Sequence, residues 1–286
     1  MPKYAVCLVH FGNKKKYLEY EIYTILMLKN NTKNDIIYLY SINDTPVEFI
    51  NIINQYNIKT IGYDDNNITF NINEYKSIYQ HFNTLRTCNY LFALKLINYD
   101  KICIVESDMV IMKNIDDIFE LDCPAILYYH GDRNKINTNH KLEIKETKDE
   151  FLNLTINKSY VNGGVLLFKP SIYYYKKMIK DLKLIISKNC INPNESLFMY
   201  SMKNIYNLPI KYNLSHYYTD QFISLKDDIV IYHFNTTEYK ALNIIKDNYI
   251  EKDKRKKYNK HIFLYFKKYY YDPFYKIINN KLNKLK

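Results

Sequence analysis

Two carboxylates, Glu106 and Asp108, flank Ser107 near the middle of the 286-residue chain. They follow a short apolar run, residues 102–105, which predicts one buried strand. Carboxylates at positions i and i+2 beyond a strand end form a compact set of hard oxygen ligands. Such a set suits a divalent cation that keeps waters and bridges phosphates, either Mn²⁺ or Mg²⁺. An isolated acid-x-acid triplet is usually a solvated turn, so the metal hypothesis depends on the surrounding segments.

The chain around this triplet alternates between strand and helix patterns. We expect strands at 4–9, 36–40, 59–63, 102–105 and 125–129, and helices at 17–29, 47–56 and 78–96. This alternation predicts an α/β fold with a single, mostly parallel, Rossmann-like sheet that has helices on both faces. Ligands of such sheets bind outside the carboxyl ends of the strands. The turn at 10–13 and the triplet at 106–108 are therefore expected on one edge of the sheet.

Four motifs follow one another along the chain: KICIVESDMVIMKNIDDIF at 101–119, YVNGGVLLFKPS at 160–171, NPNESLF at 192–198 and LPIKYN at 208–213. In this order they resemble the glycogenin-like glycosyltransferases, family 8 of the retaining enzymes. The corresponding family patterns are D-x-D followed by N-I-D-D-L-F, then F-N-S-G-V-x-x-x-x-P-S, D-Q-G-L-x-N and L-P-x-x-Y-N. The resemblance runs from residue 4 to about residue 240. It implies a GT-A type fold and the transfer of a sugar from an activated donor.

A histidine near the end of the family-like region completes the expected metal site. His233 follows the apolar run 229–232. A lone histidine after a strand is more often structural than a ligand. The resemblance implies, however, that His233 is the third protein ligand beside Glu106 and Asp108. Two oxygens and one nitrogen suit Mn²⁺ better than Mg²⁺.

Several residues are expected to bind the nucleotide-sugar donor by the same resemblance. The first strand and its turn would form the wall for uracil and ribose, and the glycine pair after 162 would let a sugar approach the backbone. Each of these residues also has a purely structural explanation. The residues of the first strand are equally well explained as core, and an arginine on a helix is commonly exposed. A glycine pair also suits a β-bulge. The chain has neither a G-x-G-x-x-G motif nor a Walker loop. The donor-binding candidates are Leu8, Val9, His10, Phe11, Tyr17, Arg86, Ser107, Asn162, Gly163 and Lys240.

The chain departs from the family pattern at several positions that matter for the donor and the metal. Glu106 replaces the usual Asp, and Tyr90 stands where the family has a lysine that reaches the donor. Asn194 and Glu195 fall on the family's D-Q pair, so they are the catalytic candidates although the Asp is lost. Glu195 would supply a carboxylate there, or would only favour the start of a helix. Lys240 is displaced by one position from the family's diphosphate-binding lysine.

The resemblance implies a metal-dependent retaining transferase that moves a hexose from a UDP-sugar to a hydroxyl on a protein or glycan. The alternative is a catalytically inactive family member that binds a UDP-sugar or acts as a scaffold. The altered positions motivate this alternative. A weaker alternative is a polyanion-binding protein whose basic tail is the working part.

The basic charge is concentrated at the end of the chain. Residues 251–286 carry a net charge of +9 out of the total +11, which leaves +2 for the rest. We therefore divide the chain into a transferase domain at 1–245 and a basic, aromatic-rich extension at 246–286. The extension would lie on an anionic membrane surface or pack on the body as a terminal helix. Nucleic acid is the least favoured partner, because no binding motif accompanies the charge.

Composition indicates the cellular class. Hydrophobic residues make up 47% of the chain, which is ample for a core. The five cysteines have no paired short spacing, so we expect reduced thiols. The first apolar run is too short for a signal peptide, and no run approaches a membrane span. We expect a cytoplasmic protein. Peripheral contact with a membrane surface and formation of a homodimer are compatible with the sequence, which does not decide either.

Overall fold

The computed structural model describes residues 2–66, 85–128, 150, 152, 161–188, 190, 192–215, 228–234, 268–269 and 272–285. Within them a seven-stranded sheet has the order β3-β2-β1-β4-β7-β6-β8. Its strands are β1 (Tyr4–His10), β2 (Asp35–Ser41), β3 (Lys59–Tyr63), β4 (Lys101–Val105), β6 (Ala125–Tyr128), β7 (Val161–Phe168) and β8 (Tyr206–Asn207). All neighbours pair in parallel except β7, which is antiparallel to both β4 and β6. The prediction of a mostly parallel sheet is confirmed.

A second, three-stranded sheet lies beside the carboxyl end of β4. It consists of β5 (Met109–Ile111), β9 (Leu214–Ser215) and β10 (Ile231–His233), with β10 in the middle. β10 is antiparallel to β5 and parallel to β9. Two short 3₁₀ helices, η4 (Asp116–Glu120) and η5 (Ile210–Tyr212), lie in the connections that lead to and from these strands.

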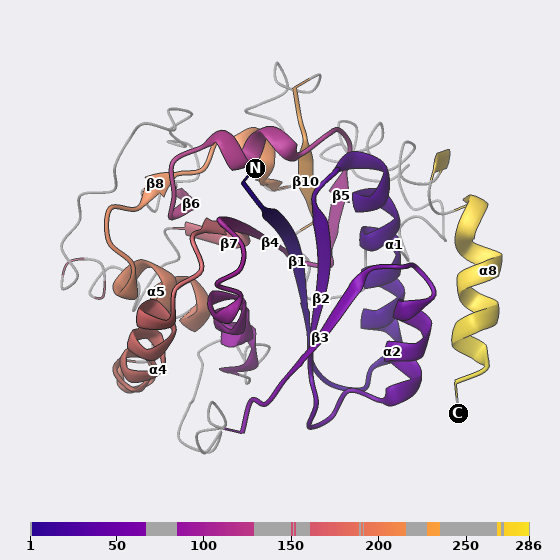
Figure 1. Ribbon diagram of the computed structural model, residues 1–286, viewed down its shortest axis with the longest axis horizontal. Helices are drawn as coiled ribbons and strands as arrows, with labels where there is room; N and C mark the ends of the chain where they lie inside the picture. Colours follow the sequence, from indigo (N-terminus) through magenta and orange to yellow (C-terminus); the bar gives the residue numbers. More distant parts are fainter. Residues whose placement is uncertain are drawn as a thin grey trace, which may run out of the picture.

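Helices cover both faces of the large sheet, as the alternating pattern predicted (Figure 1). On one side lie α1 (Lys15–Asn31), α2 (Val47–Asn54) and α8 (Asp272–Asn283), and on the other η3 (Leu85–Lys95), α4 (Ile172–Ser187) and α5 (Pro193–Ser201). The alternation of side chains along β1 divides the core accordingly. Val6 and Leu8 belong to the cluster with α1 and α2, whereas Ala5 and Cys7 belong to the cluster with η3, α4 and α5.

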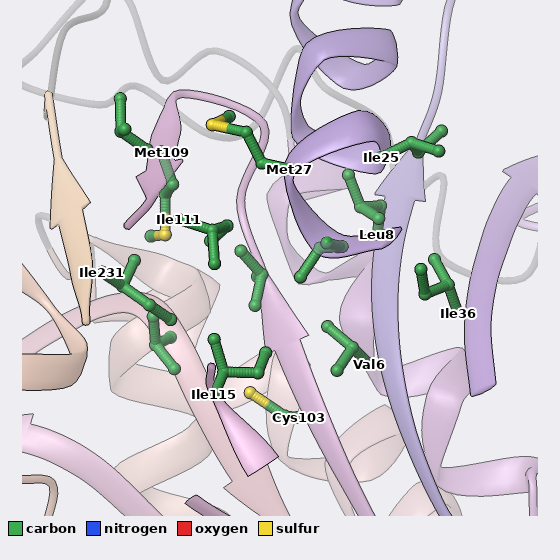
Figure 2. Packing of buried hydrophobic residues seen from close by; sticks show 14 of the residues in the cluster. Val6, Leu8, Ile25, Met27, Ile36, Cys103, Met109, Ile111, Ile115 and Ile231 are labelled. Carbon is green, nitrogen blue, oxygen red and sulfur yellow. The ribbon is translucent and has the colours of Figure 1, made fainter. Parts of the chain in front are cut away.

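The core beneath α1 also joins the two sheets. Figure 2 shows Met109 and Ile111 of β5 and Ile231 of β10 in the same cluster as Val6 and Leu8 of β1. All five side chains are almost completely excluded from solvent. The small sheet is therefore fixed to the large one by apolar packing, and this fixes the direction in which the chain leaves β4.

The helix predicted at 78–96 is only partly described, because 67–84 lie outside the described residues. The described part, Leu85–Lys95, is a 3₁₀ helix, so the predicted α-helix is wrong there. Every residue from Cys88 to Leu94 is buried, including Asn89. The segment is thus enclosed on all sides, and tertiary packing outweighs the one-sided α-helical spacing on which the prediction relied.

The last helix, α8, packs on the body of the protein. Ile278 and Leu282 are buried in the α1 cluster, and the ammonium of Lys281 lies 4.8 Å from the ring centroid of Tyr56. Lys15 at the start of α1 donates a hydrogen bond to the carbonyl of Leu285. This part of the extension is thus a packed terminal helix. The proposed boundary between 245 and 246 lies outside the described residues. No helix in the described part of the chain is long and apolar enough to cross a membrane.

A pair of adjacent isoleucines tests the docking of α8. Ile278 is fully buried and Ile277 is 52% exposed. We expect Ile278→Ala to lower the free energy of unfolding by about 2–4 kcal/mol, because it leaves a cavity at the α1 contact. The matched change Ile277→Ala should stay within about 0.5 kcal/mol of wild type. Urea denaturation measures both, and equal effects of the two changes would contradict the observed docking.

Candidate metal and donor site

The candidate site lies where the direction of strand succession reverses. From β1 the chain continues to β2 and β3 on one side, while β4 pairs with the other side of β1. Such a switch point opens a crevice outside the carboxyl ends of the two central strands. His10 ends β1 and Glu106 directly follows β4. The turn and the triplet thus lie on one edge of the sheet, as the sequence predicted, and the structure adds that their strands are neighbours.

The structure brings Glu106, Asp108 and His233 together. One potential ligand atom from each lies within 4.8 Å of the others. Nε2 of His233 is 3.4 Å from Oε2 of Glu106 and 3.3 Å from Oδ1 of Asp108. The histidine is buried, with 2% of its side chain exposed, while Glu106 is 44% and Asp108 22% exposed. The set therefore has a rigid buried nitrogen and two oxygens that open toward solvent.

Backbone pairing positions the three side chains. His233 is opposite Met109 in the antiparallel pairing of β10 with β5, and the amide of Phe234 donates to the carbonyl of Asp108 (3.1 Å). The amide of Glu106 donates to the carbonyl of Gly164 on β7 (3.0 Å). Each residue is thus held by a neighbouring strand rather than by the flexible tip of a loop.

The electrostatics of the cluster favour a cation. Burial alone lowers the pKa of His233, but the charges and hydrogen bonds of Asp108 and Glu106 outweigh burial and raise it to about 10. The two carboxylates therefore hold His233 as an imidazolium at neutral pH. A metal ion that uses Nε2 would have to displace this proton.

β7 passes directly beneath the cluster and carries an irregularity there. The register between β6 and β7 shifts after Ile126, opposite the glycine pair. A Cβ on Gly164 would lie 2.5 Å from Cε of Met109 and 2.6 Å from Nδ1 of His233. The imidazole can therefore occupy its position only because residue 164 has no side chain. We refer to this irregularity at Gly163–Gly164 as the bulge of β7, and it lies against the candidate metal ligand.

Glu195 and Asn194 lie at the start of α5, beside the same bulge. Oε1 of Glu195 accepts from the amide of Gly163 (2.8 Å), and Oε2 accepts from Nδ2 of Asn192 (2.6 Å). The carbonyl of Asn194 accepts from the hydroxyl of Tyr90 (3.0 Å). The carboxylate at 195 therefore links α5 to β7, and Tyr90 is a buried hydrogen-bond donor rather than an exposed charge.

The donor-binding candidates on the first strand differ in accessibility. Leu8 and His10 are buried. Val9 and Phe11 are partly exposed, and Tyr17 is 39% exposed. Phe11 stacks under the guanidinium of Arg86, whose central carbon lies 5.0 Å from the ring centroid. This places three partly exposed side chains of the expected nucleotide wall at the start of the turn and of α1.

Arg86 is held by two carboxylates. Its Nε donates to Oδ2 of Asp65 (3.0 Å) and one terminal nitrogen to Oδ1 of Asp44 (2.7 Å), and Asp44 also accepts from the amide of Gly12 (3.1 Å). The hydrogen bond from Arg86 lowers the pKa of Asp44. Most of the positive charge expected at this position is therefore compensated locally, and the arginine fixes the Phe11–Gly12 turn.

The remaining donor candidates are engaged in contacts within the protein or lie outside the described residues. The carbonyl of Ser107 accepts from the hydroxyl of Thr24 on α1 (2.9 Å). Asn162 is buried on β7 next to the bulge, and Gly163 contacts Glu195. Lys240 lies outside the described residues.

His10 forms a buried charged cluster that the sequence did not reveal. Nδ1 is 2.8 Å from Oε1 of Glu21 and Nε2 is 3.0 Å from the carbonyl of Gly12. The carbonyl of Gly12 and an ionised carboxylate at Glu21 both accept hydrogen bonds, so this arrangement suits an imidazolium that donates from both nitrogens. The hydroxyl of Tyr38 donates to the other oxygen of Glu21 (2.6 Å). Burial lowers the pKa of His10, but Glu21, followed by Gly12 and Asp44, raises it above its ordinary value.

This cluster predicts a pH-dependent contribution to stability. Because the folded-state pKa of His10 is raised, its contribution is complete below the unfolded value of about 6.5 and is lost as the pH rises through the folded pKa. We expect Glu21→Gln to cost about 3 kcal/mol or more at pH 6, since it leaves a buried imidazolium without its counter-charge. The cost should shrink steadily toward pH 9. Urea denaturation at several pH values measures it, and a cost independent of pH would contradict the ion pair.

The glycine pair offers a matched test of the metal site. A methyl group at 164 would collide with His233, whereas one at 163 would lie 3.0 Å from Cγ of Glu195 and away from the ligands. We expect Gly164→Ala to weaken Mn²⁺ binding by about 10- to 100-fold, the range for disturbed outer contacts of a metal site. Gly163→Ala should retain affinity within about threefold at a similar melting temperature. Calorimetric titration with Mn²⁺ measures both, and equal affinities would exclude His233 as a ligand.

No family model matches the chain. An uncharacterized protein of Acanthamoeba polyphaga mimivirus, R707, is 26% identical over 283 residues, which cover 93% of this chain and 92% of that protein. Among solved structures, the galactosyltransferase LgtC in complex with donor and acceptor sugar analogs superposes with a TM-score of 0.54 at 11% identity, covering 81% of this chain and 87% of LgtC. The bifunctional glycosyltransferase WbbM also gives 0.54 at 14% identity, and GlyE of Streptococcus pneumoniae gives 0.51 at 16% identity, each over 82% of this chain. The chain spans about half the length of WbbM and GlyE (46% and 55%). The fold of this chain is therefore that of the GT-A glycosyltransferases.

Proposed function

We propose that the chain is a metal-dependent glycosyltransferase that moves a hexose from a UDP-sugar to a hydroxyl on a protein or glycan, with retention at the anomeric carbon. One observation carries this proposal. Glu106, Asp108 and His233 converge within 4.8 Å at the switch point of a GT-A fold. The resemblance of the sequence motifs to the glycogenin-like family supports the donor and the stereochemistry.

The three side chains fit a divalent cation. Two carboxylates and one imidazole form a mixed oxygen and nitrogen set that suits Mn²⁺, with Mg²⁺ as the harder alternative. The exposure of Glu106 and Asp108 leaves the outer side of the set open to water and to phosphate oxygens. A cation bound there would supply charge neutralisation for the diphosphate leaving group.

The chain itself would bind and orient the donor. The bulge at Gly163–Gly164 lets a sugar approach the backbone of β7, and Asn162 beside it is an amide that suits sugar hydroxyls. Phe11 and Tyr17, with Val9, would form the wall for the base and ribose. Glu195 would act from the first turn of α5, where its carboxylate is oriented by Gly163 and Asn192.

A binding or scaffold role is the second candidate, because the proposed donor site has less uncompensated positive charge than the family pattern implies. Arg86 is engaged by Asp44 and Asp65, and the hydroxyl of Tyr90 is bound to a backbone carbonyl. An inactive member of the fold would keep metal-dependent UDP binding without turnover.

We also propose a cytoplasmic location. Contact of the basic extension with an anionic membrane and formation of a homodimer are separate hypotheses that turnover does not test.

The decisive measurement is release of UDP from a panel of UDP-sugars with Mn²⁺, with Mg²⁺ and with chelator. We expect metal-dependent turnover of one sugar in wild type and a loss on the order of 10²-fold or more in Asp108→Asn. Asp117→Asn is the matched control, since Asp117 is exposed on η4 outside the cluster. UDP binding without turnover would favour the scaffold role, and absence of UDP binding would exclude both.

A further inference from the structure

Asn213 is a fully buried amide between the candidate metal ligand and the bulge of β7. It lies between η5 and β9, next to the strand that pairs with β10. Its Oδ1 is 3.0 Å from Nδ1 of His233. Its Nδ2 donates to both oxygens of Asn162, the side-chain Oδ1 at 2.9 Å and the carbonyl at 3.1 Å. One side chain thus connects the two elements on which the proposed chemistry depends.

The partners of Asn213 determine which way its amide faces. The carbonyl of Asn162 accepts hydrogen bonds and cannot donate them, so the NH₂ group of Asn213 must face it. The oxygen of Asn213 then faces His233, and Nδ1 of the imidazole must carry a hydrogen to make this bond. Nε2 is left as the nitrogen that faces Glu106 and Asp108. The orientation therefore selects the ring nitrogen available to a metal.

The same contacts form a closed circuit. From Asn213 it passes to Oδ1 of Asn162, which also accepts from the amide of Gly164 (3.0 Å). The carbonyl of Gly164 accepts from the amide of Glu106 (3.0 Å), and Glu106 faces His233 across the cluster. A shift of either ligand would have to break a buried hydrogen bond of this circuit and leave a buried polar group without its partner.

We propose that Asn213 is a positioning residue that orients His233 for metal binding and ties it to Asn162, next to the bulge at Gly163–Gly164. The inference rests on the proposed metal site. Asn213 would act through His233, without itself contacting the donor or the metal. A merely structural asparagine would affect folding without changing how the folded protein binds a cation.

The test is the affinity for Mn²⁺ alone, measured by calorimetry, in wild type and Asn213→Leu. We expect a 10- to 100-fold loss, because substitution of an outer partner of a ligating histidine has this effect. Asn207→Leu is the matched control. Asn207 is also fully buried, and its Oδ1 accepts from the amide of Tyr128 (2.9 Å), outside the circuit. Asn207→Leu should lower the melting temperature and leave the affinity for Mn²⁺ unchanged.

A second variant keeps the test informative if Asn213→Leu fails to fold. Asn162→Ala should also weaken Mn²⁺ binding, although this side chain does not face the cluster directly. In the Zn²⁺-loaded wild type, nitrogen NMR should show a hydrogen on Nδ1 of His233 and metal at Nε2. Folded variants at 213 and 162 that bind Mn²⁺ like wild type would overturn the positioning role.

The outcomes separate this inference from the proposed function. Mn²⁺ binding that depends on Asn213, without turnover of any UDP-sugar, would support the positioning role and refute the transferase. Turnover with Mn²⁺ affinity independent of Asn213 would support the transferase and refute the positioning role. Absence of Mn²⁺ binding in wild type would refute both.

Discussion

The pairing of β5 with β10 is the interaction on which the candidate site depends. It places His233, more than 120 positions away in the sequence, beside the turn that carries Glu106 and Asp108. A slip of one residue would turn the imidazole to the opposite face of the small sheet. The apolar side chains of Met109, Ile111 and Ile231 oppose such a slip, because they are buried in the core beneath α1. Hydrophobic packing thereby sets the geometry of a polar site.

Buried polar clusters fix the edge of the sheet around this pairing. His10 with Glu21 holds the turn after β1, Arg86 with Asp65 holds the turn after β3, and Asn213 holds the imidazole of His233. A buried ion pair contributes little net stability, and removing one partner is strongly destabilising. Such clusters therefore favour one arrangement of the turns over others, which is what the proposed binding of a cation and a diphosphate would require.

The two ends of the proposed donor site differ in electrostatic character. The metal end concentrates negative charge on Glu106 and Asp108, which a cation would balance. At the nucleotide end, Arg86 is already balanced by Asp44 and Asp65. If a UDP-sugar binds here, the aromatic surface of Phe11 and the cation would have to supply most of the attraction. This is the structural reason why an inactive binding protein remains a distinct hypothesis for the same fold.

The sequence by itself predicted the alternating strands and helices, the two-sided core and the acidic triplet beyond β4, because these follow from local periodicity and from the chemistry of adjacent residues. It nominated His233 only through resemblance to a family, since a lone histidine carries no spacing signal. It mistook 85–95 for an α-helix and did not reveal Glu21 or the role of Asn213. Their partners come from distant segments, as Asn213 lies 51 positions from Asn162 in the chain. Which buried polar groups meet was decided only by the tertiary structure, because hydrogen-bond partners are chosen by strand order and register rather than by neighbours in the chain.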